Sequence, residues 1–141
     1  MKFMVIVKAS AASEAGIMPS EKLFTDMGNF NEELVKAGVL LAGEGLHPSS
    51  KGARIRFSGD QRTVIDGPFT ETKELVAGFW LIEVGSKEEA VEWFKRCPNP
   101  HEGVESEIEI RQIFGPDDFG TALPDDVRAQ EDRLRDEMAA R

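Results

Sequence analysis

The sequence predicts an α+β fold: a ferredoxin-like βαββαβ sandwich with an inserted hairpin and a C-terminal helix. Apolar runs typical of strands alternate with two amphipathic helical stretches, in the order of two successive βαβ units. The length of 141 residues suits one domain with its own core. The expected strands are apolar on both sides, whereas the helices of this fold cover one face. We therefore expect a homodimer that hides the other face.

The first βα pair has clear start and stop signals. A strand is expected at residues 4–7, and the small, polar stretch 9–18 after it is read as irregular. A helix follows, with Ser20 placed to cap its start and Gly38 placed for the left-handed residue at its end. One helical stripe is formed by Leu23, Met27, Phe30 and Leu34.

The middle of the chain predicts four more strands and a turn-rich stretch. Residues 39–46 form a strand whose two glycines permit a bulge or the close approach of another backbone. Residues 54–57 and 63–65 flank a Gly-Asp-Gln turn, which predicts the inserted hairpin. The hairpin leads to residues 66–74, and the longest apolar run, 75–84, is predicted to be a central strand.

The second helix is predicted from a capping box, in which Ser86 and Glu89 satisfy each other's free amides. Its apolar face includes Phe94 and Cys97, and the prolines that follow end it. Residues 105–114 then alternate charged and apolar side chains, which is typical of a strand with one apolar face.

The C-terminal part of the chain is acidic and carries a thin apolar stripe, formed by Val127, Leu134 and Met138. We expect a domain over residues 1–119, followed by an acidic helical extension over residues 120–141. The extension docks on the body, reaches a second subunit or frays; the sequence leaves these three alternatives open.

Composition and charge exclude several classes of protein. The net charge of −9 disfavours a nucleic-acid partner, because phosphate-binding surfaces need excess lysine and arginine. No run approaches the roughly 18 apolar residues of a membrane span, and residues 1–8 read as a strand and not a signal peptide. We therefore expect a cytoplasmic protein without a membrane partner. A single cysteine excludes an intrachain disulfide framework, and the two histidines, His47 and His101, show no metal-ligand spacing. No motif indicates a cofactor.

Turn chemistry and charge concentrate in residues 66–74, DGPFTETKE. The Asp-Gly-Pro sequence restricts the backbone, so the loop is expected to be rigid. Asp66 is a candidate general base, with its pKa tuned by Glu71 or Lys73. Alternatively, Asp66 caps the turn while Lys73 pairs with Glu71 or Glu74 at the surface. A third interpretation makes the loop a clamp at the dimer interface.

Further candidates lie on strands and strand ends. His47 follows a glycine-rich strand and is a candidate for proton transfer near neutral pH; the alternative is a surface histidine. The arginines Arg54, Arg56 and Arg111 lie at alternating strand positions, where they are placed to hold a carboxylate or phenolate ligand. Equally, Arg111 pairs with Glu109 or Glu107 from a neighbouring strand.

Several motifs resemble the YCII-related family, specifically its DGPF-domain branch: LLAGEGL at 40–46, Pro48-Ser49, DGPF at 66–69, EEA at 88–90 and EIR at 109–111. The resemblance covers residues 1–119. It implies a dimeric α+β barrel of two facing ferredoxin-like sheets, with a cleft in each subunit near the interface. The wider superfamily includes lyases, isomerases and cofactor-independent monooxygenases. Some DGPF members are associated with alternative sigma factors.

Short YCII members resemble this chain less in one respect. They carry a helix histidine that is paired with an aspartate in a proposed acid/base dyad, whereas the matching helix face here has Met27, Gly28, Asn29 and Phe30. The resemblance therefore does not transfer the dyad.

These patterns predict a protein that binds a small anionic or aromatic molecule near the DGPF loop. The predicted activity is that of a cofactor-independent lyase or isomerase, with Asp66 and His47 as acid/base residues; whether turnover occurs is left open. The predicted ligand-binding residues are Glu71, Lys73, Arg54, Arg56 and Arg111. The alternative is a non-catalytic regulatory or binding module linked to transcription, acting through the acidic tail.

Overall fold

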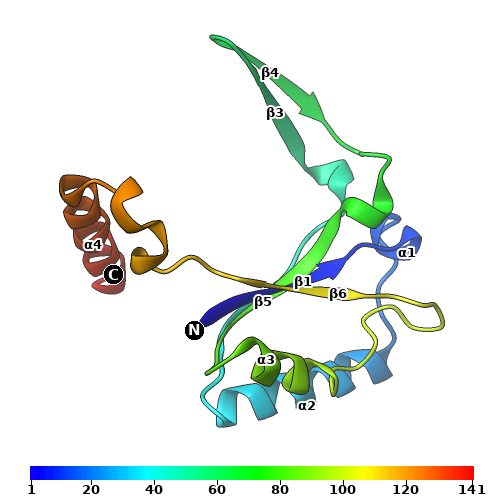
Figure 1. Ribbon diagram of the computed structural model, residues 1–141. Coiled ribbons are helices and arrows are strands. Elements are labelled where there is room, and N and C mark those ends of the chain that lie inside the picture. Colours follow the sequence, from blue (N-terminus) through cyan, green and yellow to red (C-terminus); the bar gives the residue numbers. More distant parts are fainter.

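A computed structural model describes residues 1–141 and has the predicted ferredoxin-like α+β fold (Figure 1). Its central sheet has the strand order β2-β5-β1-β6 and is antiparallel throughout. The four strands are β1 (Lys2–Lys8), β2 (Leu40–Gly45), β5 (Val76–Glu83) and β6 (Ile108–Gln112). The run predicted as a central strand is therefore central, with β2 and β1 on its two sides.

Helices α2 (Glu21–Lys36) and α3 (Lys87–Phe94) cover one face of this sheet (Figure 1). Between sheet and helices lies a cluster of 11 buried hydrophobic residues. At its centre, the rings of Phe30, Trp80 and Phe94 meet edge to face, with centroid distances of 5.1 to 6.3 Å. Such contacts between aromatic edges and faces stabilise a core beyond the burial of area alone.

The predicted helix signals are confirmed at α2 and corrected at α3. The hydroxyl of Ser20 accepts a hydrogen bond from the amide of Leu23 at 3.1 Å, and Gly38 has a φ of 72°. At α3 the hydroxyl of Ser86 accepts from the Glu89 amide, but the Glu89 carboxylate binds the amide of Gly85 and not that of Ser86. The residue between them, Ser86, has an extended backbone conformation.

Other boundaries also differ from the prediction. The helix α3 ends at Phe94, so Cys97 lies beyond it, half-buried against the core. The last strand is five residues long and not the ten expected. Pairing of β2 with β5 shifts in register between Leu40 and Ala42, so the irregularity lies at Leu41 and not at the glycines. The stretch read as irregular contains α1 (Ala11–Glu14), which is capped by Ser10.

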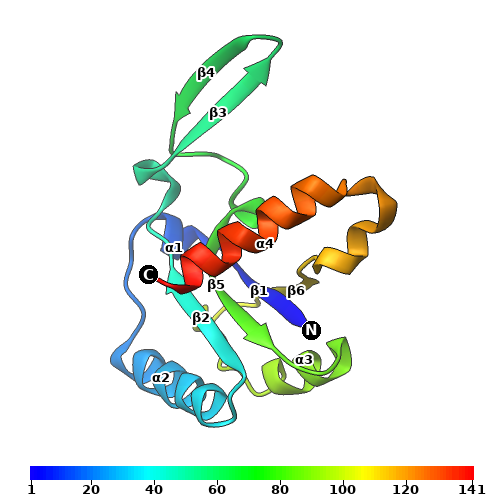
Figure 2. The same ribbon diagram turned by 90° about the vertical axis from the view of Figure 1, so that its left-hand side faces the viewer.

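The inserted hairpin is present as predicted, and its strands form a separate two-stranded sheet. Strands β3 (Ala53–Ser58) and β4 (Gln61–Asp66) project away from the body (Figures 1 and 2). The predicted turn is formed by Gly59, with a φ of 57°, and Asp60. Short 3-10 helices precede and follow the hairpin: η1 (Ser49–Lys51) and η2 (Thr72–Glu74).

The second face of the central sheet carries apolar side chains that no helix of the chain covers closely. They are the half-buried Met4, Ile6, Phe79 and Leu81, placed on this face by the strand register. After η3 (Pro116–Ala122), helix α4 (Asp125–Ala139) lies on this side, away from α2 and α3, and buries no residue (Figures 1 and 2). The division into residues 1–119 and 120–141 stays a prediction. None of the helices is long and apolar enough to cross a membrane.

Candidate functional site

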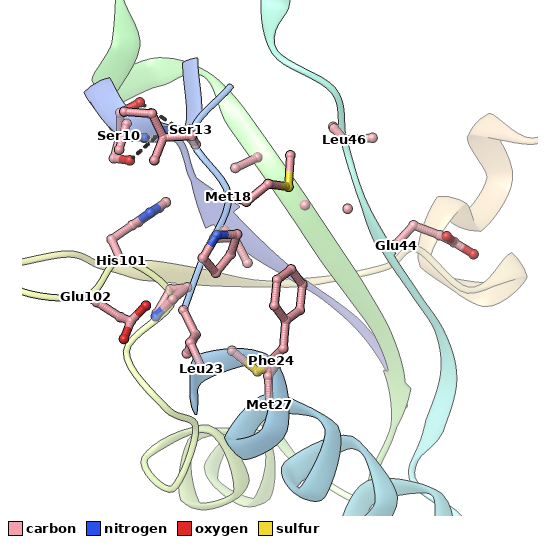
Figure 3. Close-up of a pocket in the computed structure, with 18 of the residues that line it drawn as sticks. Ser10, Ser13, Met18, Leu23, Phe24, Met27, Glu44, Leu46, His101 and Glu102 are labelled. Carbon is pink, nitrogen blue, oxygen red and sulfur yellow. Dashed lines mark hydrogen bonds between the residues drawn. The ribbon is translucent and has the colours of Figure 1, made fainter. Parts of the chain in front are cut away.

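A cleft of about 1080 Å³ opens between the central sheet and the N-terminal half of α2 (Figure 3). Its walls come from α1, the connection to α2, the end of β2 and the loop around His101. Half of its 28 lining residues are hydrophobic and only two, Glu44 and Glu102, are acidic, so most of the lining carries no charge. Volumes of this order hold small organic molecules in proteins.

The mouth of the cleft is surrounded by large apolar side chains that remain open to solvent. Their exposed fractions run from 50% for Leu46 to 74% for Met18, with Ile17 and Phe24 between them. Figure 3 shows Met18, Phe24 and Leu46 extending from three different segments around the same space. Single exposed apolar residues are normal, but four around one hollow form an apolar patch, which makes the cleft the candidate binding surface. The flexible thioethers of Met18 and Met27 allow this surface to adapt to a ligand.

The polar groups of the cleft include two imidazoles and two carboxylates. They belong to His47, His101, Glu44 and Glu102, and no lysine or arginine lines the cleft. The Nε2 of His101 lies 2.6 Å from the carbonyl oxygen of Lys8. Because a carbonyl oxygen only accepts hydrogen bonds, Nε2 carries the proton, and Nδ1 is the basic nitrogen of the neutral ring.

One wall of the cleft, residues 9–20, is tied down by two pairs of glutamate and serine. The Glu14 carboxylate accepts hydrogen bonds from the Ser49 hydroxyl and, at 2.9 Å, from the Ser49 amide. The Glu102 carboxylate accepts from the Ser20 hydroxyl at 2.6 Å and from the Ser20 amide at 3.0 Å. In each pair the hydrogen bonds from serine favour the ionised carboxylate and lower the pKa of the glutamate.

The DGPF loop is attached to the same Ser49. The amide of Phe69 donates a hydrogen bond to the Ser49 hydroxyl at 3.0 Å, and the amide of Gly67 donates to the Gly52 carbonyl at 3.0 Å. A Cβ atom on Gly67 would lie 1.7 Å from the carbonyl oxygen of Ser49, so no other residue fits this backbone. We call this set of contacts the DGPF junction; it fixes the base of the hairpin to η1.

The side chain of Arg54 completes the surface of the DGPF junction. The guanidinium of Arg54 lies 3.8 Å above the ring of Phe69, and its nitrogen is 3.9 Å from the Glu71 carboxylate. Both charged groups are about half exposed. The Arg54 side chain therefore covers Phe69 in a cation–π contact, and its ion pair contributes little to stability.

The structure brings few of the sequence-predicted site residues together. His47 lines the cleft, and Arg54 lies near Glu71 at the junction. The others are exposed and do not line the cleft: Asp66 at the end of β4, Arg56 on β3, Lys73 in η2 and Arg111 on β6. Arg111 donates to Glu109 at 3.2 Å, so one of the two alternative partners is found, but within β6 and not across from a neighbouring strand. This bond is the largest cause of the lowered pKa of Glu109.

Several residues of the cleft were not predicted from the sequence to be site residues. The only hint for Ile17 and Met18 was two large apolar residues in a small, polar stretch. Phe24 lies beside the predicted helix stripe and not on it. No group of three or more His, Cys, Asp or Glu side chains is placed to hold a metal ion.

The part of the chain that forms the cleft is similar to known proteins. The model of the YCII-related domain matches residues 1–114. An uncharacterised protein of Rhizobium meliloti (strain 1021) is 33% identical over 93 residues, which are 66% of this chain and 74% of that protein. Every cleft residue lies within the matched domain, whereas α4 lies outside it.

Proposed function

Because this chain belongs to the YCII-related domain family, we propose that it is a homodimeric protein that binds a small molecule in the cleft between α2 and the sheet. The observation that carries the proposal is the group of exposed apolar side chains around one cleft. Exposed apolar area costs free energy in water, and an apolar ligand removes it from water when it binds.

The lining of the cleft favours an aromatic or aliphatic ligand without negative charge. Glu44 and Glu102 contribute two carboxylates and no cation balances them within the cleft, so an anion would be repelled. The predicted aromatic ligand suits this surface. An anionic ligand held by Arg54, Arg56 or Arg111 would instead bind outside the cleft.

For turnover we propose the acid/base chemistry of a lyase or isomerase, with His47 as the proton carrier. His47 is the predicted catalytic residue that lines the cleft, and the Nδ1 of neutral His101 is the second basic nitrogen there. Asp66 serves this chemistry only for a ligand that extends from the cleft to the base of the hairpin. The DGPF-branch assignment also stays a proposal; it rests on the residues 66–69.

The homodimer is proposed from the second face of the sheet. The apolar side chains of Met4, Ile6, Phe79 and Leu81 lie on it, and the same face of a second copy would bring equally apolar side chains against them. Sedimentation of the wild-type chain and of Phe79→Glu tests this interface. A dimer that persists in Phe79→Glu contradicts it.

Ligand binding is tested by titration with N-phenyl-1-naphthylamine, a neutral apolar dye that fluoresces in apolar sites. We expect saturable binding to the wild type and roughly tenfold weaker binding to Phe24→Ser, because the ring lost from the mouth contributes apolar contact. The matched control is Phe57→Ser, since Phe57 is similarly exposed but lies on the hairpin. Equal binding to Phe24→Ser and Phe57→Ser would refute the site.

A second candidate function is a regulatory module that binds another protein through α4. It is favoured by one observation: α4 buries no residue in the chain and carries an apolar stripe. A chain that ends at Gly120 distinguishes the two functions. Dye binding that survives this truncation, together with loss of a protein partner, supports regulation.

A further inference from the structure

The hairpin has one exposed apolar face without a partner in the chain. Ile55 pairs with Val64 and Phe57 with Arg62, so these four side chains share a face. Phe57 is 70% exposed, and the guanidinium of Arg62 lies 4.6 Å above its ring. A two-stranded sheet with such a face is only marginally stable by itself in water. It therefore gains stability from any surface that covers it.

Helix α4 has a complementary face. Val127, Leu134 and Met138 lie on one side of the helix, and Glu131 shares that side by its spacing. Leu134 is 40% exposed and Met138 61%. The apolar residues of α4 therefore suit the apolar residues of the hairpin face, and the carboxylate of Glu131 suits the positive charge of Arg62.

Charge and length match as well. The hairpin holds three arginines against two aspartates, and α4 holds six acidic residues against three arginines. Each hairpin strand has six residues and spans about 20 Å. Helix α4 has 15 residues and spans about 22 Å. The two elements are therefore of nearly equal length.

We propose that the hairpin of one copy of this chain docks on α4 of a second copy, with Phe57 and Ile55 packed against Leu134 and Met138. Within one chain the two elements stand well apart (Figures 1 and 2). In a two-fold dimer the exchange occurs twice, so it adds two equal contacts to those between the sheets. The inference rests on the proposed homodimer and concerns a different surface from the sheet face.

The first test measures dimer affinity of the full chain by sedimentation over a dilution series. We expect Phe57→Ser and Leu134→Ser each to raise the dissociation constant roughly tenfold, because each removes apolar contact area. Thr63→Ala is the control, since Thr63 lies on the opposite face of the hairpin. If neither variant differs from Thr63→Ala while the dimer forms, the docking is refuted and the sheet-face dimer stands.

The second test establishes that the contact joins two copies. Chains with Phe57→Cys are mixed with chains with Leu134→Cys, both in a Cys97→Ala background, and treated with a short bismaleimide. We expect a crosslinked dimer in the mixture at several times the yield of either chain alone. No excess in the mixture would refute the docking, as would a crosslink within a single chain carrying both substitutions. A monomeric wild type refutes it too, while dye binding reports separately on the cleft.

Discussion

The DGPF junction and the cleft are neighbours that share the turn at Pro48 and Ser49, yet they are built in opposite ways. Pro48 lines the cleft, whereas Ser49 holds the DGPF loop. The junction is rich in motif residues, and its hydrogen bonds and close contacts fix backbone. The cleft draws its apolar side chains from several segments, among them the LLAGEGL stretch at 40–46, and it encloses space. The DGPF motif therefore marks backbone geometry, and the cleft lies beside it.

The largest effect is expected from Gly67→Ala. The new methyl group would overlap the Ser49 carbonyl, which is backbone and yields little, so we expect a loss of about 3 kcal/mol in the free energy of unfolding. Thermal and urea unfolding measure it. Gly45→Ala is the control, because a Cβ there meets no atom within 4 Å. If both variants unfold alike, the backbone of the DGPF junction can move to admit a methyl group, and the junction is not rigid.

Substitutions at the mouth of the cleft are expected to change the affinity for a ligand and not the free energy of unfolding. Leu46→Ser should weaken binding of the naphthylamine dye five- to tenfold, since it removes apolar contact at the mouth. Its stability should change by less than about 0.5 kcal/mol, as for other exposed positions. Leu41→Ser is a close control: Leu41 is 49% exposed against 50% for Leu46, but it does not line the cleft. Equal loss of affinity in both would contradict the assignment.

A smaller effect is expected from Ser49→Ala, which acts on both regions. The amide of Phe69 loses its acceptor, and an unpaired, half-buried amide costs about 1 kcal/mol. Limited proteolysis should then cut faster between residues 66 and 74. Ser50→Ala is the control, because Ser50 is exposed beside it. Unchanged proteolysis in Ser49→Ala would show that other contacts hold the loop.

The smallest expected effect is a pH dependence from Glu14. Its pKa is lowered from 4.5 by the bonds from Ser49, so its contribution to stability is fully present above pH 4.5. The contribution disappears as the pH falls through the lowered pKa. The difference in melting temperature between wild type and Glu14→Gln should therefore be constant from pH 7 to about pH 5 and shrink below it. A difference that grows in acid would reverse the sign and exclude the proposed cause.

The order of elements was predictable because its signals are local. Ser20, Gly38 and the apolar run of β5 act through neighbours in sequence, and each has the predicted role. Helix α1 was missed because four residues are too few for a helical pattern, and Glu14 is held by a serine 35 positions away. The Glu89 bond to Gly85 depended on the conformation before the helix, which the capping pattern does not specify.

The cleft was less predictable than the fold for a physical reason. Ile17, Phe24 and Leu46 become one surface only after α2, β2 and the connection between α1 and α2 take their places. Their apolar character was visible in the sequence, but their exposure was not. His47 was predicted from its chemistry and does line the cleft, whereas the charged residues of the DGPF stretch lie elsewhere. Their predicted catalytic and binding roles stay untested.

The hydrogen bond from Gly67 to Gly52 has a consequence for how this protein can change. It joins the two ends of the hairpin at its base. The number of residues in the hairpin can therefore change without moving the two points at which it leaves and re-enters the domain. Insertions, deletions or whole replacements at the turn of Gly59 and Asp60 are then absorbed outside the cleft. A longer or shorter hairpin would therefore leave the backbone around the cleft in place.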